Sequence, residues 1–307
     1  MDRTRTVEIT DCHGCGAEAV RLYSDCRDLE YFVQASSDLY RCSGCGLVFM
    51  HPLPSRAELP TLYPSNYHNF DPPSNAISRF LLDRYYKHHS AICRKYLPTD
   101  GAMLEIGSAA GDLLVRMQQS GHQNVQGVEI SADACERAWA RGLKVFHGTL
   151  DEFATNERFD LIFMSHVIEH VLDPVATVAK IKSLLEPGGV VYIETPNVAS
   201  LDARLWKGRW GLIHYPRHLY LFDRSTVRRL LQGAGLEDVR VSSQVNSCGW
   251  ALSVQSDLRR LGIDRSRRPR SAYYPLLLLL FLPVNLVDLC FGATAFISAT
   301  ARKPGDR

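Results

Sequence analysis

The sequence predicts an α/β fold with a mostly parallel sheet, a small cysteine-rich module ahead of it and an apolar insertion before its last strand. Short apolar segments alternate with helical spacing from about residue 100 to residue 200, which is typical of a parallel sheet covered by helices. Two cysteine pairs lie in the first 50 residues, and a leucine run lies near the C-terminus. We expect four parts: the cysteine module at 1–50, a proline-rich linker at 51–75, the α/β core at 76–246 and 292–303, and the insertion at 247–291.

Composition narrows the class and the compartment. A formal net charge of +2 over 307 residues gives no global reason to expect nucleic acid as a partner. The first residues contain no apolar run of signal-peptide length, so the cytoplasm is the expected compartment. An odd count of nine cysteines in a chain without an export signal favours thiols and metal ligands over disulfides.

The cysteine module repeats one pattern, in which two cysteines stand three apart and a glycine follows. The four cysteines are Cys12, Cys15, Cys42 and Cys45. This spacing predicts a zinc ribbon, because two tight turns can bring four thiolates together in a tetrahedron. His13 is an alternative ligand, but four cysteines already saturate the site. A closed site with four protein ligands leaves no position for water, so the predicted Zn²⁺ is structural.

The stretch at 51–75 contains six prolines and cannot be a regular element. Its aromatic side chains, Tyr63, Tyr67 and Phe70, either cover a neighbouring pocket or simply pack on the core surface. From Ser74 onward the apolar residues fall at helical spacing, so a helix is expected to introduce the core.

A strand at 102–106 runs directly into a turn of small residues at 107–111, and a helical pattern follows. Glycines at such a turn let the backbone approach a ligand, and the helix N-terminus presents unpaired amides. Gly107 and Gly111 stand at G-x-x-x-G, which differs from the dinucleotide fingerprint. The acidic Glu105 just before the turn would repel a pyrophosphate, and it suits the cationic amino-acid half of S-adenosylmethionine better.

Four further strands follow this turn. We expect them at 125–129, 143–147, 159–164 and 190–194, with a turn at 186–189 leading into the last. The second strand ends in Glu129, a carboxylate placed to accept hydrogen bonds from two ribose hydroxyls. Residues 148–150 form the exit turn of the third strand, where the adenine edge is expected.

These motifs, taken together and in this order, resemble those of the class I S-adenosylmethionine-dependent methyltransferases. The matching segments are 104–111, 127–129, 159–162, 166–174 and 185–189. The resemblance implies a Rossmann-like seven-stranded sheet and S-adenosylmethionine as cofactor. It also implies the cofactor-binding residues, which are Glu105, Gly107, Ser108, Gly111, Glu129, Ile130, Thr149, Leu150 and Ser165. Residues 108–110 depart from the pattern, since many members have more glycine there.

The cysteine module ahead of this core further resembles that of bacterial methyltransferases in sugar, surface-polysaccharide and secondary-metabolite pathways. This looser resemblance covers residues 10–70. It implies an acceptor hydroxyl on a sugar or on a lipid-linked glycan intermediate.

Three histidines are the candidate catalytic residues, because a hydroxyl acceptor benefits from a general base and histidine is the usual one. His166 and His170 lie four apart after the fourth strand, where the resembled enzymes bring substrate to the cofactor. His218 lies in a stretch rich in polar aromatics, 206–220, which suggests an acceptor-site insertion. Each histidine has a structural alternative as a packed, hydrogen-bonded side chain. A metal held by His166, His170, His214 and His218 is a further alternative.

The C-terminal part begins with a helix at 223–235 and a strand at 239–243, and 295–301 is expected to be the last, antiparallel strand. Between them, arginines at 259, 260, 265, 267, 268 and 270 precede the leucine run. Pro283, Asn285 and Asp288 interrupt this run, which disfavours a membrane span. We expect peripheral membrane contact through 259–290 at the inner face of the cytoplasmic membrane, or else a buried hairpin or dimer interface.

Two other functions compete with this prediction. A nucleic-acid-modifying methyltransferase would bind phosphates with the arginine cluster, but the leucine run would then have no explanation. A non-catalytic scaffold of the same fold is the second, and the intact carboxylates and glycines around the turn argue against it.

Overall fold

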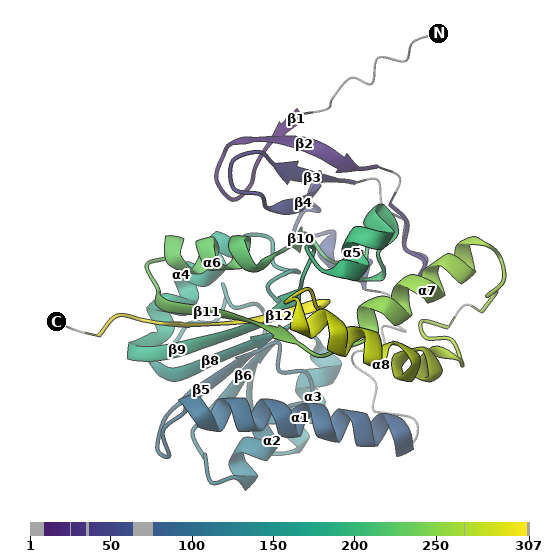
Figure 1. Ribbon diagram of the computed structural model, residues 1–307. Coiled ribbons are helices and arrows are strands. Elements are labelled where there is room, and N and C mark those ends of the chain that lie inside the picture. The colour runs from purple at the N-terminus through teal and green to yellow at the C-terminus, as the bar shows by residue number, and fades with distance from the viewer. Residues whose placement is uncertain (1–8, 25, 35–36, 64–75, 267, 306–307) are drawn as a thin grey trace.

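The computed structural model describes residues 9–24, 26–34, 37–63, 76–266 and 268–305, which form two sheets with helices around the larger one (Figure 1). The larger sheet has seven strands in the order β11-β12-β9-β8-β5-β6-β7. This confirms the predicted α/β class with a seven-stranded mixed sheet.

The centre of the large sheet is parallel. Its strands are β5 (Met103–Ile106), β6 (Val125–Glu129), β7 (Lys144–His147), β8 (Phe159–Ser165), β9 (Leu185–Pro196), β11 (Glu237–Gln244) and β12 (Phe296–Arg302). Only β12 runs antiparallel to both of its neighbours, β9 and β11, as expected for the last strand. Between β8 and β9, Phe159 pairs with Leu185, and Leu161 pairs with Val190. Two residues of β8 therefore span five residues of β9, and residues 186–189 form the predicted turn.

The strand register gathers the predicted site at one edge of the sheet. Ile106, the last residue of β5, pairs with Val128 on one side and Met164 on the other. The turn after β5 therefore lies beside the ends of β6 and β8, which carry Glu129 and Ser165.

Helices cover both faces of the sheet (Figure 1). One face carries α1 (Ala76–Tyr96), α2 (Asp112–Gln119) and α3 (Ala132–Ala140), and the other carries α4 (Pro174–Leu184) and α6 (Arg224–Gly233). N-cap side chains determine where several helices begin. At α6, Asp223 forms a capping box with Thr226. The helix predicted from Asp223 therefore begins where the sequence indicated.

The smaller sheet is shared between distant parts of the chain. Its first four strands are β1 (Ile9–Asp11), β2 (Glu18–Tyr23), β3 (Asp38–Cys42) and β4 (Val48–His51). The fifth is β10 (Tyr220–Leu221), which pairs antiparallel with β4. The segment after His218 is thus built into the cysteine module, a connection that the sequence did not reveal.

The described part of the proline-rich linker lies against the core. After η1 (Leu59–Leu62) the predicted linker residues 64–75, with Tyr67, Phe70 and the predicted cap Ser74, fall outside the described residues. Arg56 forms an exposed ion pair with Asp151, next to the predicted adenine turn. This contact brings the linker to the cofactor side of the sheet.

The C-terminal insertion is a pair of helices, α7 (Cys248–Arg260) and α8 (Tyr274–Cys290), and α7 packs on η4 (Gly211–Ile213). No helix in the described part of the chain combines the length and apolarity that a membrane crossing needs. Two arginines of the segment 259–290, for which we expected peripheral membrane contact, pair with carboxylates of the protein. Arg259 is buried beside Asp264, and Arg270 pairs with Glu30 of the cysteine module. Arg267 is outside the described residues.

Candidate functional site

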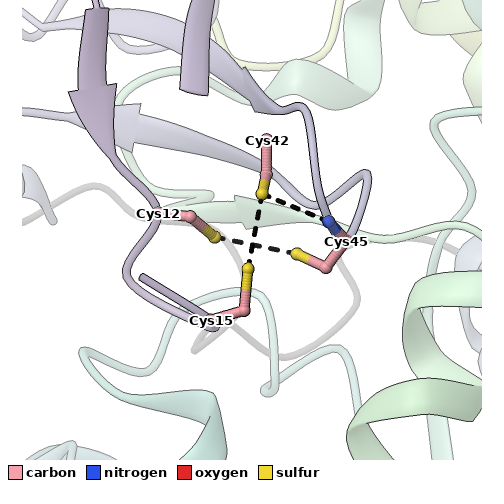
Figure 2. A group of neighbouring side chains, drawn as sticks. All are labelled: Cys12, Cys15, Cys42 and Cys45. Atoms are coloured by element: carbon pink, nitrogen blue, oxygen red, sulfur yellow. Dashed lines mark hydrogen bonds between the residues drawn. The ribbon is translucent and has the colours of Figure 1, made fainter. Parts of the chain in front are cut away.

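The four predicted metal ligands meet in one cluster (Figure 2). The Sγ atoms of Cys12 and Cys45 lie 3.7 Å apart, and those of Cys15 and Cys42 lie 3.5 Å apart. Tetrahedral Zn–S bonds of about 2.3 Å place sulfur atoms about 3.8 Å apart, so the donor set fits Zn²⁺. The amides of Gly14 and Cys45 point at sulfur. His13 is exposed and its ring packs against Phe49, outside this cluster.

The turn after β5 has the left-handed backbone that the glycine pattern predicts. Gly107 and Gly111 have φ of 76° and 79°. A Cβ at Gly107 would lie 2.4 Å from Val167, and one at Gly111 would lie 2.1 Å from Leu143. Ala109, where related sequences have more glycine, is also left-handed at φ 46°. The loop therefore keeps a glycine-type path in spite of its alanines.

Glu129 is held rigidly at the end of β6. One carboxylate oxygen accepts a hydrogen bond from the Ala109 amide and the other from the Ser131 amide, both at 2.8 Å. Burial raises the pKa of this carboxyl, while the Ser131 and Ala109 amides oppose the rise. The turn after β5 and the predicted ribose ligand are thus one hydrogen-bonded unit.

Two buried polar atoms beside this unit have no partner among the described residues. They are Oε2 of Glu105 and Oγ of Ser108. Burial, and then the nearby charge of Glu129, raise the pKa of Glu105 well above its usual value. Because an unpaired buried polar group is costly, this arrangement fits a polar ligand with a cationic group at the turn. The residues present therefore fit the amino-acid half of S-adenosylmethionine.

The other predicted cofactor residues lie around the same edge. Ile130 is 59% exposed directly after Glu129 and offers an apolar surface there. Leu150 is buried, and Thr149 donates from its amide and its hydroxyl to Glu152. Ser165 at the end of β8 lies 3.0 Å from the Tyr85 hydroxyl of α1.

His166 is clamped between two carboxylates. Its Nδ1 lies 3.5 Å from Glu169 and its Nε2 lies 3.4 Å from Glu194, with a left-handed φ of 56°. Burial opposes the charged ring, but the two carboxylates outweigh burial and raise the pKa of His166 to about 10. His166 is therefore an imidazolium at neutral pH and has no free lone pair to accept a proton.

His170, in contrast to His166, is neutral at neutral pH. Burial lowers its pKa to about 4 in spite of the neighbouring Glu169 charge. Its Nδ1 lies 2.9 Å from the Arg217 carbonyl oxygen, which can only accept, so Nδ1 carries the hydrogen. The neutral ring then holds its lone pair on Nε2. The Tyr63 hydroxyl lies 3.1 Å from Nδ1, so the linker aromatic does reach this site.

His218 is buried, with both ring nitrogens hydrogen-bonded. Nδ1 lies 2.9 Å from the Leu212 carbonyl and Nε2 lies 3.3 Å from Nδ1 of His214. Glu169, His170 and His218 can place one ligand atom each within 4.8 Å of one another. A metal there would have to displace the hydrogen bonds of His218, so the geometry favours the structural role.

An ion pair that the sequence did not predict connects the cysteine module to this site. Asp28 accepts two hydrogen bonds from the Arg217 guanidinium, at 2.8 and 3.0 Å, and both side chains are almost fully buried. The Asp28 carboxylate also accepts hydrogen bonds from the backbone amides of residues 30, 31 and 33. Because the Arg217 carbonyl fixes His170, the module positions His170 through this pair.

The first core helix adds a second group of side chains that sequence reasoning missed. His89 of α1 lies 3.0 Å from Glu194, the carboxylate that also contacts His166. Tyr192 donates to the same carboxylate. Nothing in the sequence distinguishes His89 from an ordinary packed residue, since its partner Glu194 lies 105 residues away.

Comparisons with known proteins agree with this geometry. Residues 63–241 match the family described as a methyltransferase domain. A ubiquinone biosynthesis O-methyltransferase of Cereibacter sphaeroides is 29% identical over 194 residues, covering 57% of this chain and 76% of that protein. One from Aromatoleum aromaticum is 35% identical over 103 residues, covering 31% and 44%.

Among solved structures, the phosphoethanolamine N-methyltransferase 2 of Haemonchus contortus in complex with S-adenosyl-L-methionine has a TM-score of 0.53. The two proteins are 16% identical, and the match covers 97% of this chain and 71% of the Haemonchus protein. This likeness concerns the fold alone.

Proposed function

The chain belongs to the methyltransferase-domain family and is an S-adenosylmethionine-dependent methyltransferase, and from this premise we propose that it methylates a hydroxyl oxygen of a sugar or lipid-linked glycan intermediate. The choice of oxygen is supported by the neutral His170, whose Nδ1–H bonds to the Arg217 carbonyl and leaves the ring's lone pair on Nε2. The curated relatives named O-methyltransferases support the same choice.

The proposed division of labour follows from the contacts. Glu105, Ser108 and the glycine turn would hold the amino-acid half of the cofactor, and Glu129 the ribose, with Ile130, Thr149 and Leu150 around the adenine. When bound, S-adenosylmethionine supplies a methyl group activated by its cationic sulfur. His170 would take the hydroxyl proton on Nε2, and the methyl group that moves from sulfur to the acceptor oxygen would leave the cofactor as S-adenosylhomocysteine. His166, held as an imidazolium, and His218, bonded on both nitrogens, position this base.

We assign a structural Zn²⁺ to the four cysteines. Their closed set of four sulfur ligands leaves no open position for chemistry, and the metal would hold the two cysteine turns together.

The test of this function uses S-adenosylmethionine with a trideuterated methyl group and extracts of cell-envelope lipids and nucleotide-linked sugars. We expect the purified protein to form a trideuteromethyl ether on a sugar. His170→Gln should lower the rate by about 10²- to 10⁴-fold, which is the usual contribution of a general base. Wild-type kcat/KM should not follow His170 titration from about pH 6 to about pH 8, because its pKa of about 4 leaves the ring neutral there.

Asn156→Ala, a change in the loop before β8, is the matched control and should leave the rate unchanged. Label on nitrogen or carbon in place of oxygen would contradict the proposed acceptor atom. An unchanged rate in His170→Gln would remove His170 from the mechanism.

We further propose that α8 rests on an anionic membrane surface, where a lipid-linked acceptor would be found. Its outward side chains and the neighbouring Phe291 are 40–80% exposed and all apolar; they are Leu276, Leu279, Leu280, Leu282, Leu286, Val287, Leu289 and Phe291. Asp288, the only charged residue of α8, is buried and bonded to Trp250. Arg260 at the end of α7, and Arg265 and Arg268 in the loop before α8, are exposed, so cationic residues precede the apolar helix in the chain, as expected for contact with a lipid surface.

Serine at Leu276, Leu279 and Leu280 together should weaken binding to vesicles of phosphatidylserine and phosphatidylcholine at least about tenfold, because three large apolar side chains no longer enter the acyl boundary. Cosedimentation measures this, with Val175→Ser on α4 as the control. The membrane proposal is contradicted if the wild type does not bind vesicles and sediments as a dimer, and if the triple serine variant is a monomer. The exposed apolar face of α8 would then join two copies of the chain.

A further inference from the structure

A cavity of about 320 Å³ lies between the cysteine module and the core, and its lining includes Val198, two residues after the end of β9. Tyr23 of β2 and Arg41 of β3 form the wall on the module side. The opposite wall comes from α5 (Leu201–Trp206) and the segment that follows it. Its volume falls in the range of small-molecule sites.

The charges around this cavity all have one sign. Arg41, Arg204 and Lys207 line it, and none of the lining residues is acidic. The three cationic side chains are exposed, and among the described residues none of them has a hydrogen bond or ion pair. A concave surface lined by one sign of charge raises the local concentration of the opposite ion.

Lys207 has a backbone conformation that points to a role for its side chain. It follows the end of α5 with φ 52° and ψ −128°, where glycine is the residue without steric cost. A non-glycine residue in such a region stores strain, and strain of this kind clusters at functional sites. The chain therefore carries a cation at the cavity where glycine would be more stable.

Most of the other lining residues are apolar. Val198, Ala203, Ile213 and Leu221 line the cavity together with the cations, and so does Trp210, whose indole nitrogen is already bonded to Asp202. Ile213 directly precedes His214, which contacts His218, so the cavity adjoins the histidine cluster through one short segment. A lining that combines cationic and apolar side chains suits an anion that carries an apolar or sugar group.

We propose that this cavity binds the diphosphate of the methyl acceptor. The proposal rests on the proposed function for the acceptor class, and it deepens that function by assigning the anionic part of the acceptor to Arg41, Arg204 and Lys207. The cysteine module then has a binding role, because it supplies one wall of the site. Both a nucleotide-linked and a lipid-linked sugar carry this diphosphate.

The test is calorimetric titration of the full chain with inorganic pyrophosphate, without cofactor or acceptor. We expect binding that weakens with salt. Alanine at Arg204 and Lys207 together should weaken it at least about tenfold, equal to about 1.4 kcal/mol. Arg228→Ala, an exposed arginine on α6, is the matched control and should bind as the wild type does. Titration with uridine diphosphate and with farnesyl diphosphate then distinguishes the two sources.

Lys207→Gly separates the role of the charge from damage to the fold. It should raise the melting temperature, because the left-handed strain is relieved, and still weaken pyrophosphate binding. The proposal is overturned if wild-type protein gives no pyrophosphate binding at low salt, or if Lys207→Gly and the double alanine variant bind as tightly as the wild type. Because no methyl transfer is measured, these results stand apart from any failure to find a glycan product.

Discussion

Replacement of Glu129 by alanine is expected to weaken S-adenosylmethionine binding by at least about 100-fold. The carboxylate would accept hydrogen bonds from both ribose hydroxyls, and hydrogen bonds to a charged group contribute about 1.5–3 kcal/mol each. Two such bonds correspond to about 3 kcal/mol or more, which is at least a factor of about 100 in Kd. Calorimetric titration with S-adenosylmethionine measures the loss.

Glu129 also orders the ligand-free turn, and a conservative variant separates the two effects. Glu129→Gln keeps one acceptor oxygen for the Ala109 or Ser131 amide and so should retain the folded turn. It should still bind the cofactor at least about tenfold more weakly than the wild type. Glu136→Ala on α3, which faces solvent, serves as the control. Wild-type affinity in Glu129→Ala would contradict the proposed ribose site.

The second large effect is expected at the pair of Asp28 and Arg217. Arg217→Ala leaves the buried Asp28 carboxylate without its partner, which costs about 3–5 kcal/mol of the free energy of unfolding. Because the Arg217 carbonyl fixes His170, methyl transfer should fall as well. Loss of the guanidinium also removes a charge that lowers the pKa of His170. The pKa that describes the acid limb of the pH profile should therefore rise toward the ordinary pKa of histidine.

A double replacement distinguishes positioning from stability. Asp28→Asn with Arg217→Met removes both buried charges and keeps an amide oxygen for the backbone amides of residues 30, 31 and 33, so it should recover part of the stability lost in Arg217→Ala. The low rate and the shifted pH profile should remain. Lys144→Ala, which breaks an exposed ion pair with Glu157, should cost less than about 1 kcal/mol. A wild-type pH profile in both Arg217 variants would show that the pair only supports the fold.

The features predicted well from the sequence are those set by local chain chemistry. The glycine turn, Glu129 and the strands that carry them follow from spacing over a few residues, and they lie together because parallel strands end at one edge. The cysteine cluster was predicted for the same reason, since two short turns determine it. The β12 position came from the family resemblance and agrees with the sheet order.

Contacts between distant segments could not be predicted. Asp28 and Arg217 are 189 residues apart, and β10 joins the module only because the 217–221 segment folds back onto β4. The arginine cluster shows the same limit. Arg265 is exposed to solvent, whereas Arg259 is buried against Asp264. The sequence of the arginine cluster does not distinguish these two environments. His166 and His170 follow the same strand, but the Glu169 and Glu194 carboxylates raise the pKa of His166 while burial lowers the pKa of His170, and the sequence does not show this difference.

The measurement that tests the central claim most directly is the structure of the complex with S-adenosylhomocysteine. We predict that both ribose hydroxyls lie within hydrogen-bonding distance of the Glu129 carboxylate, and that the amino-acid half lies at Gly107, Ser108 and Glu105. The sulfur should face Nε2 of His170 across a space open to the acceptor. A nucleoside bound away from Glu129, or a sulfur turned away from the 166–170 segment, would contradict the proposed site.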